Sequence, residues 1–166
     1  MENSLFDVFL RLGAATLAGM VLGLNRDLRG KPTGIRTLGL VSLGVAIATV
    51  AVLRTEQAVS DVGTYGRVLQ GIVQGVLTGI GFLGGGVILR SPETHSVRNL
   101  TTAATVWVTA AIGIACSVAS WPVLGMGLFF AIALLAIGDS FDKAIAKWYK
   151  PRHDETHPKE MDRSQK

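Results

Sequence analysis

Long apolar stretches alternate with short charged segments along this chain. No charged residue occurs in residues 68–89 or in residues 99–138. About 20 apolar residues cross the hydrocarbon core of a bilayer as a helix, and the backbone polar groups in lipid must be satisfied within that helix. The pattern therefore predicts an all-α, polytopic membrane helix bundle. The five predicted transmembrane helices cover residues 6–24, 37–53, 68–89, 101–120 and 122–138.

Lys and Arg are concentrated in three of the segments outside these spans. Residues 25–36, 90–100 and 139–166 hold 13 of the 16 basic residues. Because Lys and Arg are enriched in cytoplasmic segments, we expect these three segments in the cytoplasm, with the N-terminus outside and the C-terminus inside. Orientation alone then explains the net charge of +4, and we expect no nucleic-acid partner.

The pattern changes after the fifth span. Phe141, Ile145 and Trp148 recur at helical spacing among lysines, which is typical of an amphipathic helix on the surface of a membrane. Pro151 ends that helix, and the polar segment behind it predicts a disordered cytoplasmic tail. The predicted transmembrane domain, interfacial helix and tail cover residues 1–138, 139–150 and 151–166.

Small residues recur every four positions in several spans, for example at Ala15, Gly19 and Gly23. Such rows allow close packing of membrane helices, which indicates a compact bundle or a homo-oligomer. The glycines predicted to pack helices in the third span are Gly71, Gly75, Gly79, Gly81, Gly84 and Gly85. Residues 79–84 match G-x-G-x-x-G, but inside a span this does not indicate a dinucleotide site. Packing against the fourth span is the favoured interpretation, and a loosened helix is the alternative.

The polar residues next to the spans suggest a shallow pocket at the cytoplasmic end of the bundle. Asp27 is the only acid in residues 25–36, so we expect it to pair with Arg36 or Arg98. Thr101 or Thr102 is expected to cap the fourth span through its hydroxyl.

Two polar stripes follow helical spacing inside the spans. Their members are Thr101, Thr105 and Thr109, and Gln70, Gln74 and Thr78. They could line a path for ions or form hydrogen bonds between helices. Carboxylates suited to magnesium are scarce near the spans, and no catalytic triad or metal-ligand set is visible. We therefore expect no enzyme activity, metal site or cofactor.

Three segments together resemble the MgtC/SapB family of bacterial inner-membrane proteins. They read LGLNRDLRGKPTGIRT, GIGFLGGGVILR and VRNLTTAATVWVTAAIGIAC. Asn25 and Asn99 stand where this family usually has an acid and a glycine. The resemblance is to short members without a soluble C-terminal domain. The functional pocket expected from the loop residues and from the resemblance comprises Asn25, Arg26, Asp27, Arg36, Thr37, Arg98, Asn99, Thr101, Thr102, Trp107 and Cys116.

The resemblance implies a multi-pass regulatory protein of the inner membrane. Members of the family are associated with adaptation to low magnesium, with intracellular survival of pathogens and with restraint of the proton-driven ATP synthase. The expected partners are therefore the lipid bilayer, a membrane subunit of the ATP synthase, or a second copy of the chain. The alternative function is an ion channel or transporter, for protons or monovalent cations rather than magnesium.

Overall fold

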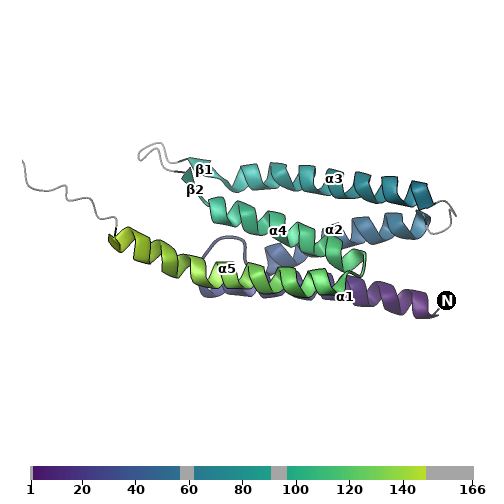
Figure 1. The fold of residues 1–166 in the computed structure, drawn as a ribbon, viewed down its shortest axis with the longest axis horizontal. Helices are drawn as coiled ribbons and strands as arrows, with labels where there is room; N and C mark the ends of the chain where they lie inside the picture. Colours follow the sequence, from purple (N-terminus) through teal and green to yellow (C-terminus); the bar gives the residue numbers. More distant parts are fainter. Residues whose placement is uncertain (1, 57–61, 91–96, 149–166) are drawn as a thin grey trace, which may run out of the picture.

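In the computed structural model the chain forms a bundle of long helices (Figure 1), and the structure describes residues 2–56, 62–90 and 97–148. The helices are α1 (Glu2–Leu28), α2 (Ile35–Glu56), α3 (Val62–Val87), α4 (Leu100–Ser117) and α5 (Trp121–Trp148), and the two-residue strands are β1 (Leu89–Arg90) and β2 (Val97–Arg98). In the described residues, five helices are long and apolar enough to cross a membrane. The predicted membrane helix bundle is confirmed, and its orientation stays a prediction.

The helices extend beyond the predicted spans at several ends. Helix α3 begins at Val62 and is continuous through its glycine-rich end to Val87, so the glycines do not interrupt it. Helix α5 is also continuous, and residues 139–148 prolong the fifth span rather than form a separate helix. The placement of this segment on the membrane surface stays a prediction, and the predicted tail lies outside the described residues.

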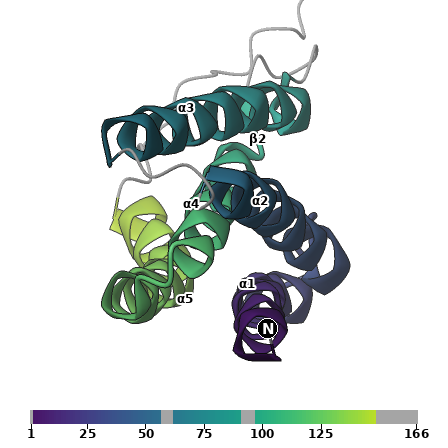
Figure 2. The ribbon, with the colours of Figure 1, turned by 90° about the vertical axis from the view of Figure 1, so that its right-hand side faces the viewer.

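Helix α4 lies at the centre of the bundle and packs against each of the other four helices. More than half of its membrane-spanning segment is buried in the protein, whereas none of the corresponding segment of α5 is buried. Helix α3 lies on the side of α4 opposite to α1 and α5 (Figure 2). Helices α3 and α5 therefore leave wide apolar surfaces that no other described part of the chain covers.

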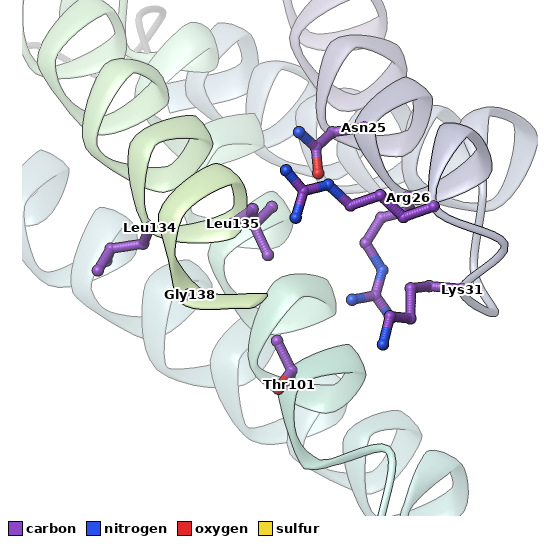
Figure 3. A pocket seen from close by; sticks show the side chains of 8 residues that line it. Asn25, Arg26, Lys31, Thr101, Leu134, Leu135 and Gly138 are labelled. Carbon is purple, nitrogen blue, oxygen red and sulfur yellow. The ribbon is translucent and has the colours of Figure 1, made fainter. Parts of the chain in front are cut away.

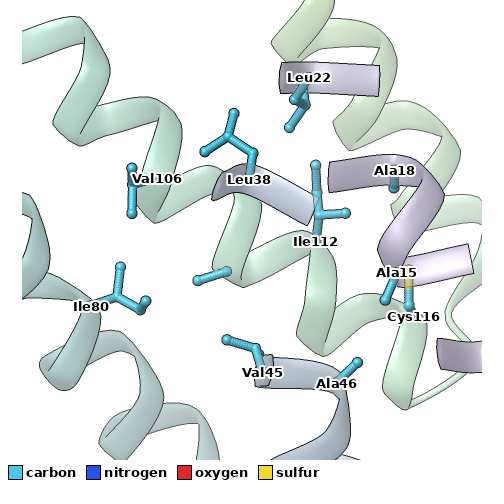
Figure 4. Close-up of a cluster of buried hydrophobic side chains, with 11 residues drawn as sticks. Ala15, Ala18, Leu22, Leu38, Val45, Ala46, Ile80, Val106, Ile112 and Cys116 are labelled. Atoms are coloured by element: carbon cyan, nitrogen blue, oxygen red, sulfur yellow. The ribbon is translucent and has the colours of Figure 1, made fainter. Parts of the chain in front are cut away.

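Small residues bring α1 and α2 into close contact, as the row at Ala15, Gly19 and Gly23 predicted. A Cβ atom added at Gly23 would lie 2.5 Å from the Cα of Ile35. The sequence did not single out Gly113, where a Cβ atom would lie 2.7 Å from the carbonyl oxygen of Ser42 and would push α4 from α2. The apolar core lies between these helices (Figure 4) and comprises Ala15, Ala18, Leu22, Leu38, Val45, Ala46, Ile80, Val106, Ala110, Ile112 and Cys116.

The start of α4 differs from the prediction, because neither Thr101 nor Thr102 caps it. Asn99 occupies the cap position in the left-handed conformation, with φ of 65°, and its side chain makes no capping hydrogen bond. Its Nδ2 atom instead donates to the carbonyl oxygen of Val87, at 3.3 Å. Left-handed backbone favours glycine and also admits asparagine, so Asn99 suits the position at which the family usually has glycine.

The end of α4 is closed by backbone hydrogen bonds and by Arg11. The amide of Ser120 donates to the carbonyl of Ala115, and the amide of Ala119 donates to the carbonyl of Cys116. This is a Schellman motif, with Ala119 in the left-handed position at φ of 53°. The Nη1 atom of Arg11 donates to the carbonyl of Ser117. Its Nε atom lies 2.8 Å from Oδ2 of Asp7, one turn earlier in α1, so the two side chains form a local ion pair.

Candidate functional site

Arg26 joins three parts of the chain at one end of the bundle. Its side chain is 3% exposed, although the sequence allowed it to be only an orientation signal. The Nη2 atom donates to the hydroxyl of Thr102 in α4 and to the carbonyl oxygen of Pro32. Because burying a charged group is costly unless it is hydrogen-bonded, these contacts fix the guanidinium between α1, α4 and the turn that follows α1.

The turn after α1 directs two further cations toward α5. Helix α1 ends in a Schellman motif, with Gly30 in the left-handed position at φ of 60° and the amide of Lys31 donating to the carbonyl of Arg26. The Nη2 atom of Arg29 reaches the carbonyl of Ala136 in α5, at 3.0 Å. The turn thereby places the cations of Arg29 and Lys31 beside that of Arg26.

Asp27 has a structural role at the start of α2, and of the two cations expected to pair with it, the side chain of Arg98 lies outside the described residues. Its Oδ2 atom accepts a hydrogen bond from the backbone amide of Ile35, at 2.9 Å, and so satisfies a free amide at the start of α2. The carboxylate lies directly against Gly34, where any Cβ atom would overlap it. Arg36 is exposed and is not the group that holds Asp27 in place.

A small cavity opens between the end of α1, the first turn of α4 and the middle of α5, and we call it the basic pocket. It has a volume of about 80 Å³. Figure 3 shows Asn25, Arg26 and Lys31 facing Thr101 of α4 and Leu135 of α5. None of its described lining residues is acidic. These residues are Asn25, Arg26, Arg29, Lys31, Thr101, Leu134, Leu135 and Gly138.

An apolar groove adjoins the basic pocket and continues between α4 and α5. Its volume is about 170 Å³, and it shares Thr101, Leu134 and Leu135 with the basic pocket. The other residues that line this apolar groove are Leu22, Ala104, Thr105, Val108 and Ala131. From Thr101 to Val108 it follows α4 for roughly 10 Å, at 1.5 Å per residue.

The structure brings together only part of the predicted functional pocket. Asn25, Arg26 and Thr101 line the basic pocket, and Thr102 supports it from behind. Asp27 caps α2, and Asn99 joins α3 to α4. Arg36 and Thr37 are exposed at the start of α2. Arg98 lies in β2, where its backbone pairs with Leu89.

Trp107 and Cys116 lie away from the basic pocket. Trp107 is 47% exposed on α4, whereas Cys116 is fully buried in the core. Cys116 is 14 residues beyond Thr102 in the same helix, which corresponds to roughly 21 Å along the helix axis. Thr102 and Cys116 are therefore too far apart to belong to a single site.

The two polar stripes do not face each other, as an ion path between them would require. The hydroxyls of Thr105 and Thr109 donate to carbonyls one turn earlier in α4, and both side chains are buried. Gln70, Gln74 and Thr78 lie on exposed positions of α3. The polar groups of α4 are therefore satisfied within their own helix.

The glycine row of α3 also faces away from the other described helices. Cβ atoms added at Gly71, Gly75 and Gly79 would meet nothing within 4 Å, and the same holds for Gly81 and Gly85. Only Gly84, among the glycines predicted to pack α3, would meet a neighbour, the Cβ of Ala103 at 3.7 Å. The predicted packing of this row on α4 is thus limited to one position, and its role against a partner stays a prediction.

The sequence reasoning missed Arg29, Lys31 and the α5 residues of the basic pocket. Leu22, Arg26 and Arg29 follow helical spacing, so this periodicity could have placed them on one face. Membrane orientation explains the same charges, because it requires basic residues at the same place. Nothing in the local sequence indicates that Leu134 and Leu135 of α5 cover that face.

Comparison with known proteins identifies relatives over most of the chain. A family model described as the MgtC family matches residues 12–144. SrpB of Synechococcus elongatus is 41% identical over 76% of this chain and 71% of its own length. No solved structure matches the chain.

Longer relatives match a smaller part of their own length. SapB of Bacillus subtilis is 35% identical and MgtC of Salmonella typhimurium is 40% identical, over 66% and 68% of this chain. These matches cover 47% of SapB and 44% of MgtC. The chain therefore spans less than half the length of these two relatives.

Proposed function

Because the chain belongs to the MgtC family, we propose that it is a regulatory protein of the bacterial inner membrane. In this proposal it acts by binding the transmembrane helices of a larger complex, in adaptation to low magnesium or to stress. The candidate partner is a membrane subunit of the proton-driven ATP synthase. The family resemblance suggests this partner.

The observation that carries the proposal is the open face of α3, which we define as Gln70, Gly71, Gln74, Gly75, Thr78 and Gly79. All six residues are exposed in the single chain, on a helix able to cross a membrane. Lipid tails offer no hydrogen-bond partner to the amides of Gln70 and Gln74. Hydrogen bonds between membrane helices contribute about 0.6–2 kcal/mol each.

The glycines beside these amides allow another helix to approach closely. Small residues spaced by four are typical of helix–helix interfaces in membranes, where lipid supplies no hydrophobic drive for association. A neighbouring helix that contacts Gly71, Gly75 and Gly79 would bring its backbone and polar groups within reach of Gln74. The open face of α3 thus has the properties of a surface that binds a second helix.

The test is ATP-driven proton pumping in inverted inner-membrane vesicles, with and without the protein. We expect the protein to reduce pumping and Gly75→Leu to restore it, because the leucine side chain prevents close approach of the partner. Gly127→Leu is the matched control. Gly127 is an exposed glycine of α5, and like Gly75 it has no neighbour within 4 Å of an added Cβ atom.

Three results would argue against this proposal. Unchanged pumping excludes the ATP synthase as the partner, and equal effects of the two leucine variants exclude the open face of α3. A collapsed proton gradient with intact ATP hydrolysis indicates ion leakage, which is the channel alternative. Asp27→Ala is not a suitable probe, because Asp27 caps α2.

A further inference from the structure

The basic pocket combines three cations with one buried acceptor. Arg26, Arg29 and Lys31 come from the end of α1 and the turn behind it, and none of the other described lining residues carries a charge. The Oδ1 atom of Asn25 is buried and has no hydrogen-bond partner among the described residues. A ligand that fits this set carries an anionic group for the cations and a donor, such as a hydroxyl, which would satisfy Asn25 once a rotation of its amide brings Oδ1 to the pocket.

The cations are suited to a phosphate even though each makes other contacts. Arg26 and Arg29 already donate to Thr102 and Ala136, and further interactions occupy these side chains and Lys31. A guanidinium has five N–H donors and an ammonium has three. A phosphate can therefore share these groups, and arginine binds phosphate oxygens particularly well.

The apolar groove decides which kind of phosphate fits. It starts at Thr101 and Leu134, which also line the basic pocket, and passes Ala104 and Val108 toward the middle of α4. A soluble phosphate has no apolar part that would fill this groove. A phospholipid places its phosphate at the membrane surface and its acyl chain in the hydrocarbon. The basic pocket and the apolar groove follow each other in the same order along the bundle.

We propose that the basic pocket and the apolar groove together bind an anionic phospholipid with a glycerol headgroup. The phosphate lies among Arg26, Arg29 and Lys31, a headgroup hydroxyl donates to Asn25, and one acyl chain lies between α4 and α5. Basic pockets between transmembrane helices on the cytoplasmic side are a recurrent form of lipid site. The predicted orientation places this end of the bundle in the cytoplasmic leaflet. The site is independent of the proposed regulation.

The experiment measures lipid binding to the full chain in detergent by native mass spectrometry. The probes are phosphatidylglycerol, phosphatidylcholine and inorganic phosphate. We expect binding of phosphatidylglycerol well above that of phosphatidylcholine, and no binding of phosphate alone. Arg29→Gln with Lys31→Gln should weaken phosphatidylglycerol binding roughly thirtyfold, from the usual contribution of two cations to anionic lipid binding.

Two further variants separate the two halves of the site. Asn25→Asp has the same size and places a negative charge in the basic pocket, so it should reduce binding of the anionic lipid without disturbing packing. Ala104→Phe fills the apolar groove from an exposed position of α4 and should reduce binding of both lipids. Arg36→Gln is the control, because Arg36 is exposed near the same end of the bundle and is not among the residues lining the pocket.

Several outcomes overturn the proposal. One such outcome is equal binding of the two lipids. Another is phosphatidylglycerol binding that survives both Asn25→Asp and the double variant. Either result shows that Arg26, Arg29 and Lys31 interact with groups of the chain itself and do not bind the lipid phosphate. A signal from inorganic phosphate that survives Ala104→Phe assigns the basic pocket to a soluble anion. An equal loss of phosphatidylglycerol binding in Arg36→Gln shows that general surface charge causes the effect.

Discussion

The contact between α1 and α2 at Gly23 supports a quantitative prediction for Gly23→Ala. The added Cβ atom would lie 2.5 Å from the Cα of Ile35 and 2.6 Å from its backbone nitrogen. Carbon atoms in good contact are about 3.5–4.0 Å apart, so the two helices must separate by roughly 1 Å. Because the neighbouring atoms belong to backbone, no side chain can rotate away. Overpacking of this kind costs about 1–3 kcal/mol.

Gly13→Ala provides the matched control for this variant. Gly13 lies in the same helix, and an added Cβ atom there would meet nothing within 4 Å. Both variants remove a helical glycine, which favours the helix by up to about 1 kcal/mol. The difference between them therefore isolates the packing cost at Gly23.

The assay is thermal unfolding in detergent, followed by circular dichroism at a helix-sensitive wavelength. We expect Gly13→Ala to melt at or above the temperature of the unchanged protein and Gly23→Ala to melt several degrees below it. The start of α2 should loosen with it, because Asp27 caps α2 at Ile35. Equal melting temperatures for the two variants would refute the close approach of α1 and α2.

Three further predictions concern single contacts and use the same melting assay. Thr102→Val should lower the free energy of unfolding by about 1–3 kcal/mol, because it removes an acceptor from buried Arg26. Thr102→Ser keeps a hydroxyl and should retain most of the stability. Equal effects of valine and serine would argue against this hydrogen bond. Asp27→Ala should cost about 0.5–2 kcal/mol through the lost hydrogen bond to Ile35, and an unchanged melting curve would argue against the cap. Ala119→Gly should stabilise the protein by about 0.5–1 kcal/mol, since its φ is 53°; a lower melting temperature would contradict the left-handed conformation of this residue.

The sequence predicted the membrane bundle because charge-free stretches of sufficient length have few alternatives. Residues 99–138 carry no charge, and the break between α4 and α5, at residues 118–120, lies close to the boundary predicted between the fourth and fifth spans. The ends of helices were less predictable. Helix α3 starts at Val62, outside the apolar run, because helices continue into polar surroundings where hydropathy no longer marks them.

Spacing alone could not tell which small-residue rows pack inside the chain. The rows at Gly19 and Gly23 and at Gly71 and Gly75 have the same period, but only the first contacts another helix of this chain. The period fixes a face of a helix and leaves its partner undetermined. The partner of each face depends on the arrangement of helices around α4.

The candidate site was harder to predict because its residues have competing roles. Charge alone predicts an ion pair for Asp27, yet its carboxylate accepts a hydrogen bond from a backbone amide eight residues later. Membrane orientation alone explains Arg29 and Lys31 in the sequence, since basic residues serve that purpose wherever they lie on the cytoplasmic side. Their role in the basic pocket depends on α5, which is more than 90 residues away in the sequence.

The first turn of α4 contacts residues next to the basic pocket on one side and helix α3, which carries the open face, on the other. Thr102 accepts a hydrogen bond from Arg26 behind the basic pocket, and the adjacent Ala103 contacts the position of Gly84 in α3. Helix α3, which carries the open face, lies on the side of α4 opposite to α1 and α5, which contribute to the basic pocket (Figure 2). The two surfaces share no residue, so a ligand in the pocket does not compete sterically with a partner helix on α3. Any energetic coupling between lipid binding and partner binding must then pass through packed groups such as those around Thr102 and Ala103.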